Sequence, residues 1–220
     1  MDVAADIVRR ITAEIAQLPT RDTPSVRAVR RRWSAALKSA PADHVLTIAG
    51  ELERAAGQGG KWVAYELIRF HRAAFDAVPA AEVERFAGRC VSWGSVDALG
   101  AILAGPLWAK GRLADAAVEA WSASPDRWLR RLALVCTVGA RADAAHTLPL
   151  CRRLALDRDD MVEKALSWAL RVLSQSDRAA VEAFVAEMDA TLAARVKREV
   201  RNKLATGLKS GRNRSMVTTA

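Results

Sequence analysis

Apolar residues recur at every third or fourth position along most of the chain, whereas the apolar–polar alternation that is typical of β-strands is nearly absent. A repeat of three to four residues places apolar side chains on one face of an α-helix. Around Val26, Val29 and Trp33, for example, the apolar row is opposed by arginines on the other side of the same segment. The pattern therefore predicts an all-α protein.

Proline and glycine residues divide the chain into about a dozen predicted helices of ordinary length. Breaks are expected, among other places, at Gly105–Pro106, Gly139 and Pro149. Short connections between many helices suit either a bundle or a solenoid of antiparallel helical pairs. The predicted helices include 3–17, 25–39, 61–77, 80–91, 94–104, 112–122, 126–138, 159–174, 178–188 and 191–206.

No long linker or low-complexity segment separates the predicted helices. We therefore expect a single domain over residues 1–208, followed by a basic and disordered tail over 209–220. With 51% hydrophobic residues, the chain of 220 residues has enough apolar surface to form a core. Intrinsic disorder is excluded for most of it.

The sequence has no feature of a membrane or exported protein. Its longest uncharged apolar stretch, residues 98–109, is far shorter than the ~20 residues that a membrane-spanning helix needs. Two aspartates, Asp2 and Asp6, precede the first basic residue, unlike the start of a signal peptide. We expect a soluble cytoplasmic protein, associated with the nucleoid if it binds DNA.

The cysteines and histidines do not form a recognisable site. Cys90, Cys136 and Cys151 are widely spaced in apolar helical segments, and the three histidines are scattered singly. A zinc site or a thiol nucleophile needs clustered partners. We therefore expect core cysteines, no metal and no cofactor.

Basic residues are concentrated near the carboxyl end. The chain carries a net charge of +9, and residues 191–220 hold eight basic residues against one acidic residue. A basic segment either improves solubility or contacts a polyanion, whose displaced counterions make such binding sensitive to salt. Composition alone does not decide between these interpretations.

Tryptophan is unusually frequent, with seven Trp against four Phe and one Tyr. Trp33 and Trp121 belong to apolar rows and are predicted core residues. Trp93 differs, because it follows a possible helix N-cap, Ser92, and precedes Asp97 by four positions. That spacing places the indole and the carboxylate on the same face of one helical turn.

Two later helices combine tryptophan with cations. The helix predicted at 126–138 begins with Arg127, Arg130 and Arg131, an unfavourable charge for a helix N-terminus. A counter-anion is therefore expected, either an acid such as Asp126 or a phosphate.

In the helix predicted at 159–174, Trp168 lies off the apolar row and in line with Lys164 and Arg171. An aromatic side chain between cations is typical of a surface that binds a nucleic acid strand. The alternative is a helix–helix contact whose neighbouring cations extend into solvent.

Four short segments occur together: SWGSVD at 92–97, RWLRRLAL at 127–134, VEKALSWALR at 162–171 and VKRE at 196–199. In order and spacing they resemble the AlkD-like DNA alkylation repair glycosylases, whose patterns are close to SWWDxVD, WLxRxA, KAIGWxLRE and KRE. The resemblance extends over roughly residues 90–204. Gly94 and Val172 stand where that family usually has acidic residues.

The resemblance implies a superhelical stack of HEAT-like helical pairs that binds duplex DNA containing alkylated bases. It implies a monomeric glycosylase that hydrolyses the N-glycosidic bond of cationic N3- or N7-alkylated purines. Asp97 would be the catalytic carboxylate, Trp93 and Trp168 would pack on the deoxyribose and backbone, and Arg131 would hold an adjacent phosphate. The other expected DNA-binding residues are Arg127, Arg130, Lys164, Arg171, Lys197 and Arg198.

Three alternatives remain open from the sequence. The first is a glycosylase for bulky alkylpurine adducts. The second is a catalytically silent HEAT-like binder of distorted or branched DNA, and the third is a helical-repeat protein adaptor. Retention of Asp97 argues against the silent binder. The scarcity of large apolar residues on the predicted outer faces argues against the adaptor.

Overall fold

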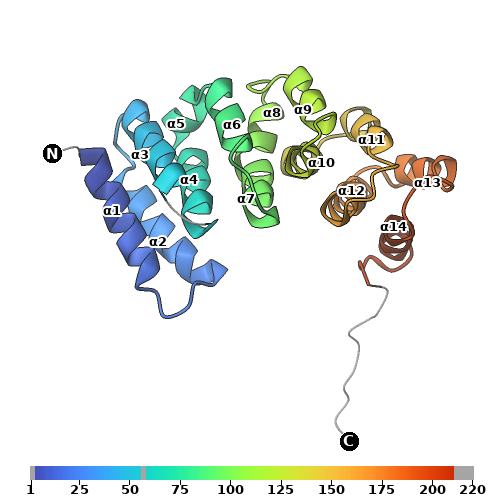
Figure 1. The fold of residues 1–220 in the computed structure, drawn as a ribbon, viewed down its shortest axis with the longest axis horizontal. Helices are drawn as coiled ribbons and strands as arrows, with labels where there is room; N and C mark the ends of the chain where they lie inside the picture. The colour runs from blue at the N-terminus through green and yellow to red at the C-terminus, as the bar shows by residue number, and fades with distance from the viewer. Residues whose placement is uncertain (1–2, 56–57, 211–220) are drawn as a thin grey trace, which may run out of the picture. The chain divides into compact units, whose positions relative to one another are not determined.

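The computed structural model describes residues 3–55 and 58–210, and all regular structure among them is helical (Figure 1). The predicted all-α class is confirmed. Contacts group the chain into two compact units, Met1–Ala114 and Asp115–Ala220, and each is described by itself. The single domain over 1–208 stays a prediction.

Unit 1, Met1–Ala114, is built around one central helix. Helix α4 packs against α2, α3, α5, α7 and the π-helical segment η1, and α1 packs mainly on α3. Tyr65 and Leu67 of α4 are buried, as are Ile48 of α3 and Phe86 of α6. The elements are α1 (Val3–Ala16), α2 (Thr23–Ala36), α3 (Ala42–Ala55), α4 (Gln58–Phe70), α5 (Arg72–Ala77), α6 (Ala80–Ala87), α7 (Trp93–Ala98), η1 (Leu99–Ala104) and α8 (Gly105–Trp108).

Unit 2, Asp115–Ala220, has two layers of helices. Helix α12 packs between α10 and α14 in one layer, and α11 packs between α9 and α13 in the other (Figure 1). From α9 to α13, each helix also packs against its neighbour in sequence. The elements are α9 (Asp115–Ser122), α10 (Arg127–Ala140), α11 (Ala144–Arg153), α12 (Asp160–Leu173), α13 (Arg178–Glu187) and α14 (Ala194–Thr206).

The prediction of one continuous helix at 61–77 is wrong, because this segment contains the end of α4 and the whole of α5. Helix α4 ends at Phe70, and His71 has an extended backbone, with φ −103° and ψ 103°. The Nδ1 atom of His71 accepts a hydrogen bond from the Ala74 amide at 3.1 Å. The histidine thus acts as an N-cap for α5, a role that its position in an apolar repeat conceals.

Two of the predicted breaks, at Gly105–Pro106 and Pro149, do not occur. Gly105–Pro106 starts α8 directly after η1, so the proline falls in the first turn of α8, where a missing amide is tolerated. The break predicted at Gly139 is confirmed to within one residue, because α10 ends at Ala140, but Pro149 lies inside α11. Helix α11 nevertheless continues, with Leu150 and Cys151 buried in the core of unit 2.

Several predicted core residues are confirmed. Trp33 and Trp121 are each only 7% exposed, and all three cysteines are buried free thiols. Burial raises the pKa of the Cys90 thiol to about 11. None of the described helices is both long enough and apolar enough to cross a membrane. Of the predicted tail at 209–220, residues 211–220 lie outside the described residues.

Candidate functional site

A cavity of about 730 Å³ opens in unit 1 between the end of α1, the start of α2, and α4, α7 and η1. Trp93 and Asp97 both line it, together with Trp62 of α4 and Arg27 of α2. The lining also includes apolar side chains such as Ile102. A hollow of this size with few polar groups is typical of a ligand site.

Helix α7 presents Trp93 and Asp97 from a firmly held turn. The Ser92 side chain accepts the Ser95 amide at 3.4 Å, and the Ser95 hydroxyl donates to the Ser92 carbonyl at 2.9 Å. Ser95, on the opposite side of the turn, and Val96 next to it are both buried. The predicted N-cap and helix start are confirmed. Because one side of this turn is buried, the side that carries Trp93 and Asp97 faces the cavity.

Trp93 is 59% exposed, which is unusual for so large an apolar side chain. Asp97, one turn later, is half-buried on the cavity wall. An indole face with a carboxylate beside it can stabilise positive charge on a bound molecule, the ring through its quadrupole and the acid through its charge.

Arg27 and Trp62 also line the cavity, and both contact the buried carboxylate of Glu66, a cluster that the sequence did not reveal. The Arg27 Nε atom and the Trp62 Nε1 atom both donate to Oε1 of Glu66, at 3.1 and 3.0 Å. The Arg27 guanidinium carbon lies 4.9 Å from the centre of the Trp62 ring. The spacing of four between Trp62 and Glu66 was the available sequence signal.

A buried carboxylate holds the loop that leads into α7. Glu53 of α3 accepts Lys61 Nζ at 2.8 Å and Arg89 Nε at 2.6 Å, and its side chain is fully buried. Lys61 also donates to the Arg89 carbonyl at 2.9 Å. Glu53 therefore ties the start of α4, which carries Trp62, to the segment before Trp93.

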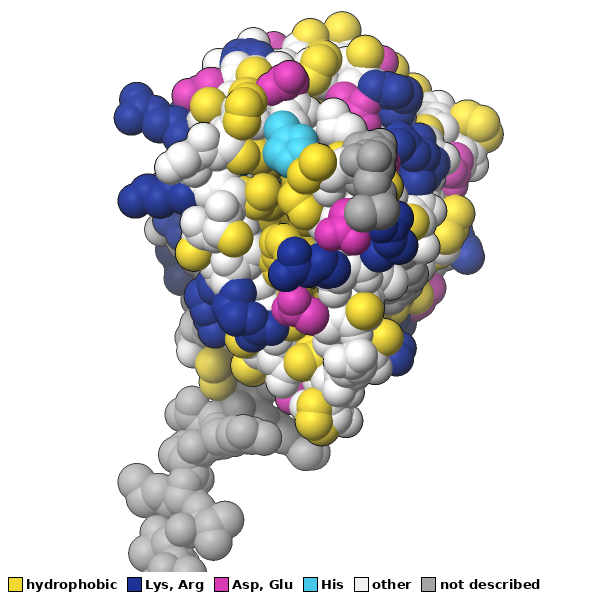
Figure 2. All heavy atoms as spheres, turned by 90° about the vertical axis from the view of Figure 1, so that its left-hand side faces the viewer, with side chains coloured by type: hydrophobic (Ala, Val, Ile, Leu, Met, Phe, Trp, Pro, Cys, Tyr) yellow, Lys and Arg dark blue, Asp and Glu magenta, His cyan; other side chains and the backbone are white. Residues whose placement is uncertain are grey.

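The outer face of unit 1 is not uniformly basic. In the space-filling view of this side, Lys and Arg side chains lie among apolar and acidic ones (Figure 2). Of the charged residues that line the cavity, Arg21 and Arg27 are cationic and Asp97 is anionic. The cavity therefore offers both signs of charge to a ligand.

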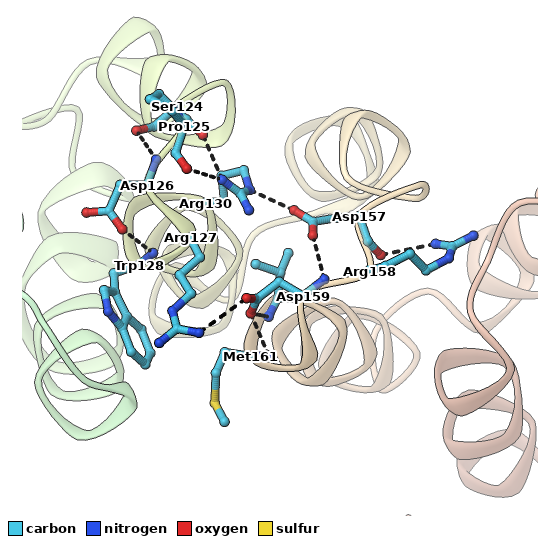
Figure 3. Close-up of polar contacts among 11 residues, drawn as sticks. Ser124, Pro125, Asp126, Arg127, Trp128, Arg130, Asp157, Arg158, Asp159 and Met161 are labelled. Carbon is cyan, nitrogen blue, oxygen red and sulfur yellow. Dashed lines mark hydrogen bonds and ion pairs between the residues drawn. The ribbon is translucent and has the colours of Figure 1, made fainter.

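In unit 2, the counter-anions predicted for the arginines of α10 are aspartates in the connection between α11 and α12 (Figure 3). Arg130 Nε donates to Asp157 Oδ2 at 2.7 Å, and Arg127 Nη1 lies 3.5 Å from Asp159 Oδ2. Asp126, the acid named from the sequence, instead caps α10 by accepting the Trp128 amide at 2.8 Å.

Arg131 is buried, with 5% of its surface exposed. Its Nη1 atom donates to the main-chain carbonyl of Met161 at the start of α12. Arg131 therefore joins α10 to α12, and its predicted role in holding a phosphate stays a prediction.

Trp168 of α12 is half-buried between the two predicted cations. Lys164 Nζ lies 2.6 Å from Asp160 Oδ2, and Arg171 Nε donates to the Ser167 hydroxyl at 3.2 Å. Burial lowers the pKa of Arg171, against the opposing influence of Glu199. Both cations flank Trp168, and both already have protein partners.

Asp160 links α12 to α14. It accepts Lys164 and also pairs with Arg195, and these two contacts lower its pKa to about 2. On α14, Lys197 donates to the Asp189 carbonyl at 2.8 Å, whereas Arg198 is exposed.

The predicted site residues thus fall into two sets. Trp93 and Asp97 share the cavity of unit 1, and Trp168 and Arg131 belong to unit 2. That the two sets face one substrate stays a prediction. Among the described residues, no group of three His, Cys, Asp or Glu side chains is arranged to hold a metal ion.

Comparison with known proteins gives one assignment. A family model described as DNA alkylation repair enzyme matches residues 5–204. Neither the curated proteins nor the solved structures contain a match. Since the matched region includes most of both units, this chain belongs to the DNA alkylation repair enzyme family.

Proposed function

We propose that the protein is a DNA glycosylase that hydrolyses the N-glycosidic bond of cationic N3- or N7-alkylated purines in duplex DNA. The observation that carries the proposal is the placement of Trp93 and Asp97 side by side on the wall of one cavity. Membership of the DNA alkylation repair enzyme family supports a role on alkylated DNA.

The chemistry needs little beyond these two groups. An alkylated purine carries a positive charge, so it leaves readily with the electron pair of the C1′–N bond and becomes neutral. Positive charge then develops on the sugar, where the Asp97 carboxylate and the Trp93 ring stabilise it. Asp97 also orients a water molecule, whose oxygen bonds to C1′ and whose proton passes to the carboxylate.

Unit 2 would hold the DNA strand. In the proposed arrangement both units form one HEAT-like superhelix, and Trp168 packs on the backbone near the damaged nucleotide. Arg131 and the other predicted cations, Arg127, Arg130, Lys164, Arg171, Lys197 and Arg198, then contact phosphates. The two-layered packing of α9–α14 supports this part of the proposal.

Product analysis tests the proposal. Wild-type protein is incubated with methylated duplex DNA, and free bases are separated from the DNA. We expect release of 7-methylguanine and 3-methyladenine, leaving abasic sites, at the same rate with and without a chelator. Binding to the same duplex without release of any base would instead identify a catalytically silent binder.

The cavity volume favours a second candidate substrate for the same reaction. About 730 Å³ is more than a methyl group requires, and apolar side chains such as Ile15, Val26 and Ile102 line it. Bulky alkylpurine adducts would then be removed in preference to methylated bases. Measurement of kcat/KM on duplexes with each lesion distinguishes the two.

A further inference from the structure

We infer that Arg27 is a phosphate-binding residue of the unit 1 cavity and that Glu66 positions it. The inference rests on the proposed function in one respect, namely that the phosphate belongs to DNA. It adds a backbone contact within the same unit as Trp93 and Asp97.

The Arg27 guanidinium is held in place on two sides. Its Nε atom donates to Glu66, and its plane lies near the face of the Trp62 ring, which is itself fixed by a hydrogen bond to the same carboxylate oxygen. Among the described residues, neither Nη1 nor Nη2 of Arg27 has a hydrogen-bond partner. The two outer nitrogens are therefore oriented before a ligand arrives, which lowers the entropy cost of binding.

The charge of this cluster is unbalanced. Glu66, with a side chain 3% exposed, also accepts Arg30 Nε at 2.7 Å, so two guanidinium groups share one carboxylate. Arg30 is 12% exposed and packs over Phe70, whereas the Arg27 side chain is 45% exposed. The surplus positive charge therefore reaches solvent through Arg27.

A phosphodiester fits this arrangement better than other anions of DNA repair substrates. The paired outer nitrogens of a guanidinium match two phosphate oxygens and form charge-assisted hydrogen bonds with them. Arg27 lines the same cavity as Trp93 and Asp97. A strand whose sugar lies against those two residues would then place a neighbouring phosphate at Arg27.

Substitution of Arg27, with a matched control on the same helix, tests the inference. Arg31 is exposed, has no ion pair within the described part of the chain and does not line the cavity. Arg27→Ala and Arg31→Ala therefore remove the same charge one helical turn apart. The probe is a duplex that contains a tetrahydrofuran abasic analogue, and its dissociation constant is measured over a series of salt concentrations.

We expect Arg27→Ala to weaken binding about tenfold and to reduce the salt slope by about 0.9, the value for one phosphate contact. Arg31→Ala should change the affinity less than about twofold. Equal losses in the two variants would overturn the inference, because they would reflect net charge alone.

Glu66→Gln separates positioning from the general electrostatic field. The substitution makes the cluster more positive, so a purely electrostatic effect would tighten binding to DNA. Positioning predicts the opposite result, because the fixed orientation of Arg27 is lost. If Glu66→Gln does not fold, Arg27→Lys replaces it, because lysine keeps the charge but lacks the guanidinium fork. Unchanged binding by Arg27→Lys would then contradict the inference.

The outcomes distinguish this inference from the proposed function. Absence of base release by wild-type protein, with the Arg27 and Arg31 variants still different in binding, would reject only the glycosylase. Base release by wild-type protein, with the two variants equal in binding, would reject only the phosphate contact. Inorganic phosphate should displace the duplex from wild-type protein more effectively than chloride does at equal ionic strength, and Arg27→Ala should abolish this excess. An excess that persists in Arg27→Ala would place the phosphate contact at another residue and overturn the inference.

Discussion

The two units place their arginines differently. In unit 1, the Nε atom of Arg27 donates a hydrogen bond to the buried carboxylate of Glu66. Arg27 also lines the cavity that contains Trp93 and Asp97. In unit 2, Arg127 and Arg130 contact aspartates in the connection between α11 and α12. Arg27 is therefore available to a ligand, whereas Arg127 and Arg130 are engaged between helices.

This difference indicates separate tasks. A guanidinium that is oriented but only partly neutralised binds an anion without first breaking a contact. A guanidinium paired with an aspartate must exchange one anion for another, so its net contribution to DNA binding is smaller. We therefore expect the specific chemistry to depend on unit 1, with unit 2 adding affinity that is sensitive to salt.

The largest effect should come from the buried carboxylate of unit 1. Glu53→Ala leaves Lys61 and Arg89 without their partner, so we expect a loss of about 3 kcal/mol in the free energy of unfolding. Glu187→Ala, which removes an exposed pair with Arg152 in unit 2, should have no measurable effect. Urea denaturation of both variants measures the contrast, and equal losses would contradict it.

The second-largest effect should come from removing the exposed indole ring of Trp93. Trp93→Ala should lower the rate of base release about tenfold, because the ring's interaction with the cationic sugar is lost. Since Trp93 is mostly exposed, the melting temperature should stay unchanged. Trp93→Phe serves as the control and should retain part of the rate, measured in single-turnover excision assays.

A smaller effect is expected at the start of α12. Asp159→Asn keeps the N-cap, because asparagine also accepts the Met161 amide, but it removes the charge that holds Arg127. Duplex affinity should rise about threefold as Arg127 becomes available to a phosphate. Asp177→Asn, at the N-cap of α13, makes the same change without an arginine partner and should not improve binding. Weaker binding by Asp159→Asn would show that the ion pair itself orders the DNA contact.

The smallest effect concerns acid stability in unit 2. The pKa of Asp160 is lowered to about 2 by Lys164 and Arg195. A lowered folded-state pKa adds stability above the ordinary value of 3.8 and loses it as the pH falls toward 2. Melting curves of wild type and Asp160→Asn should therefore differ slightly at pH 5 and converge near pH 2. A difference that persists at pH 2 would contradict the assignment.

Local features of the site could be predicted from the sequence. Ser92, Trp93 and Asp97 belong to a single helical turn, and turn geometry relates them directly. The need for anions beside the arginines of α10 was also predictable. Their identity was not, because Asp157 and Asp159 reach α10 only through the packing of α12 beside it.

The Arg27 cluster shows why the rest could not be predicted. Arg27 and Glu66 are 39 positions apart, and they meet because α2 packs on α4. Periodicity gives the faces of a helix but does not say which two faces will meet. The same limit applies to Pro149, where tertiary packing of α11 outweighs a local preference for a break.

Single-turnover release of 7-methylguanine by Asp97→Asn is the sharpest test of Asp97 as the catalytic carboxylate. Asp43→Asn, an exposed aspartate of unit 1 outside the cavity, is the matched control. We expect Asp97→Asn to bind abasic-analogue DNA like the wild type but to release the base at least about a hundredfold more slowly. Asp43→Asn should behave as the wild type. Base release by Asp97→Asn at the wild-type rate would contradict the assignment of the catalytic carboxylate.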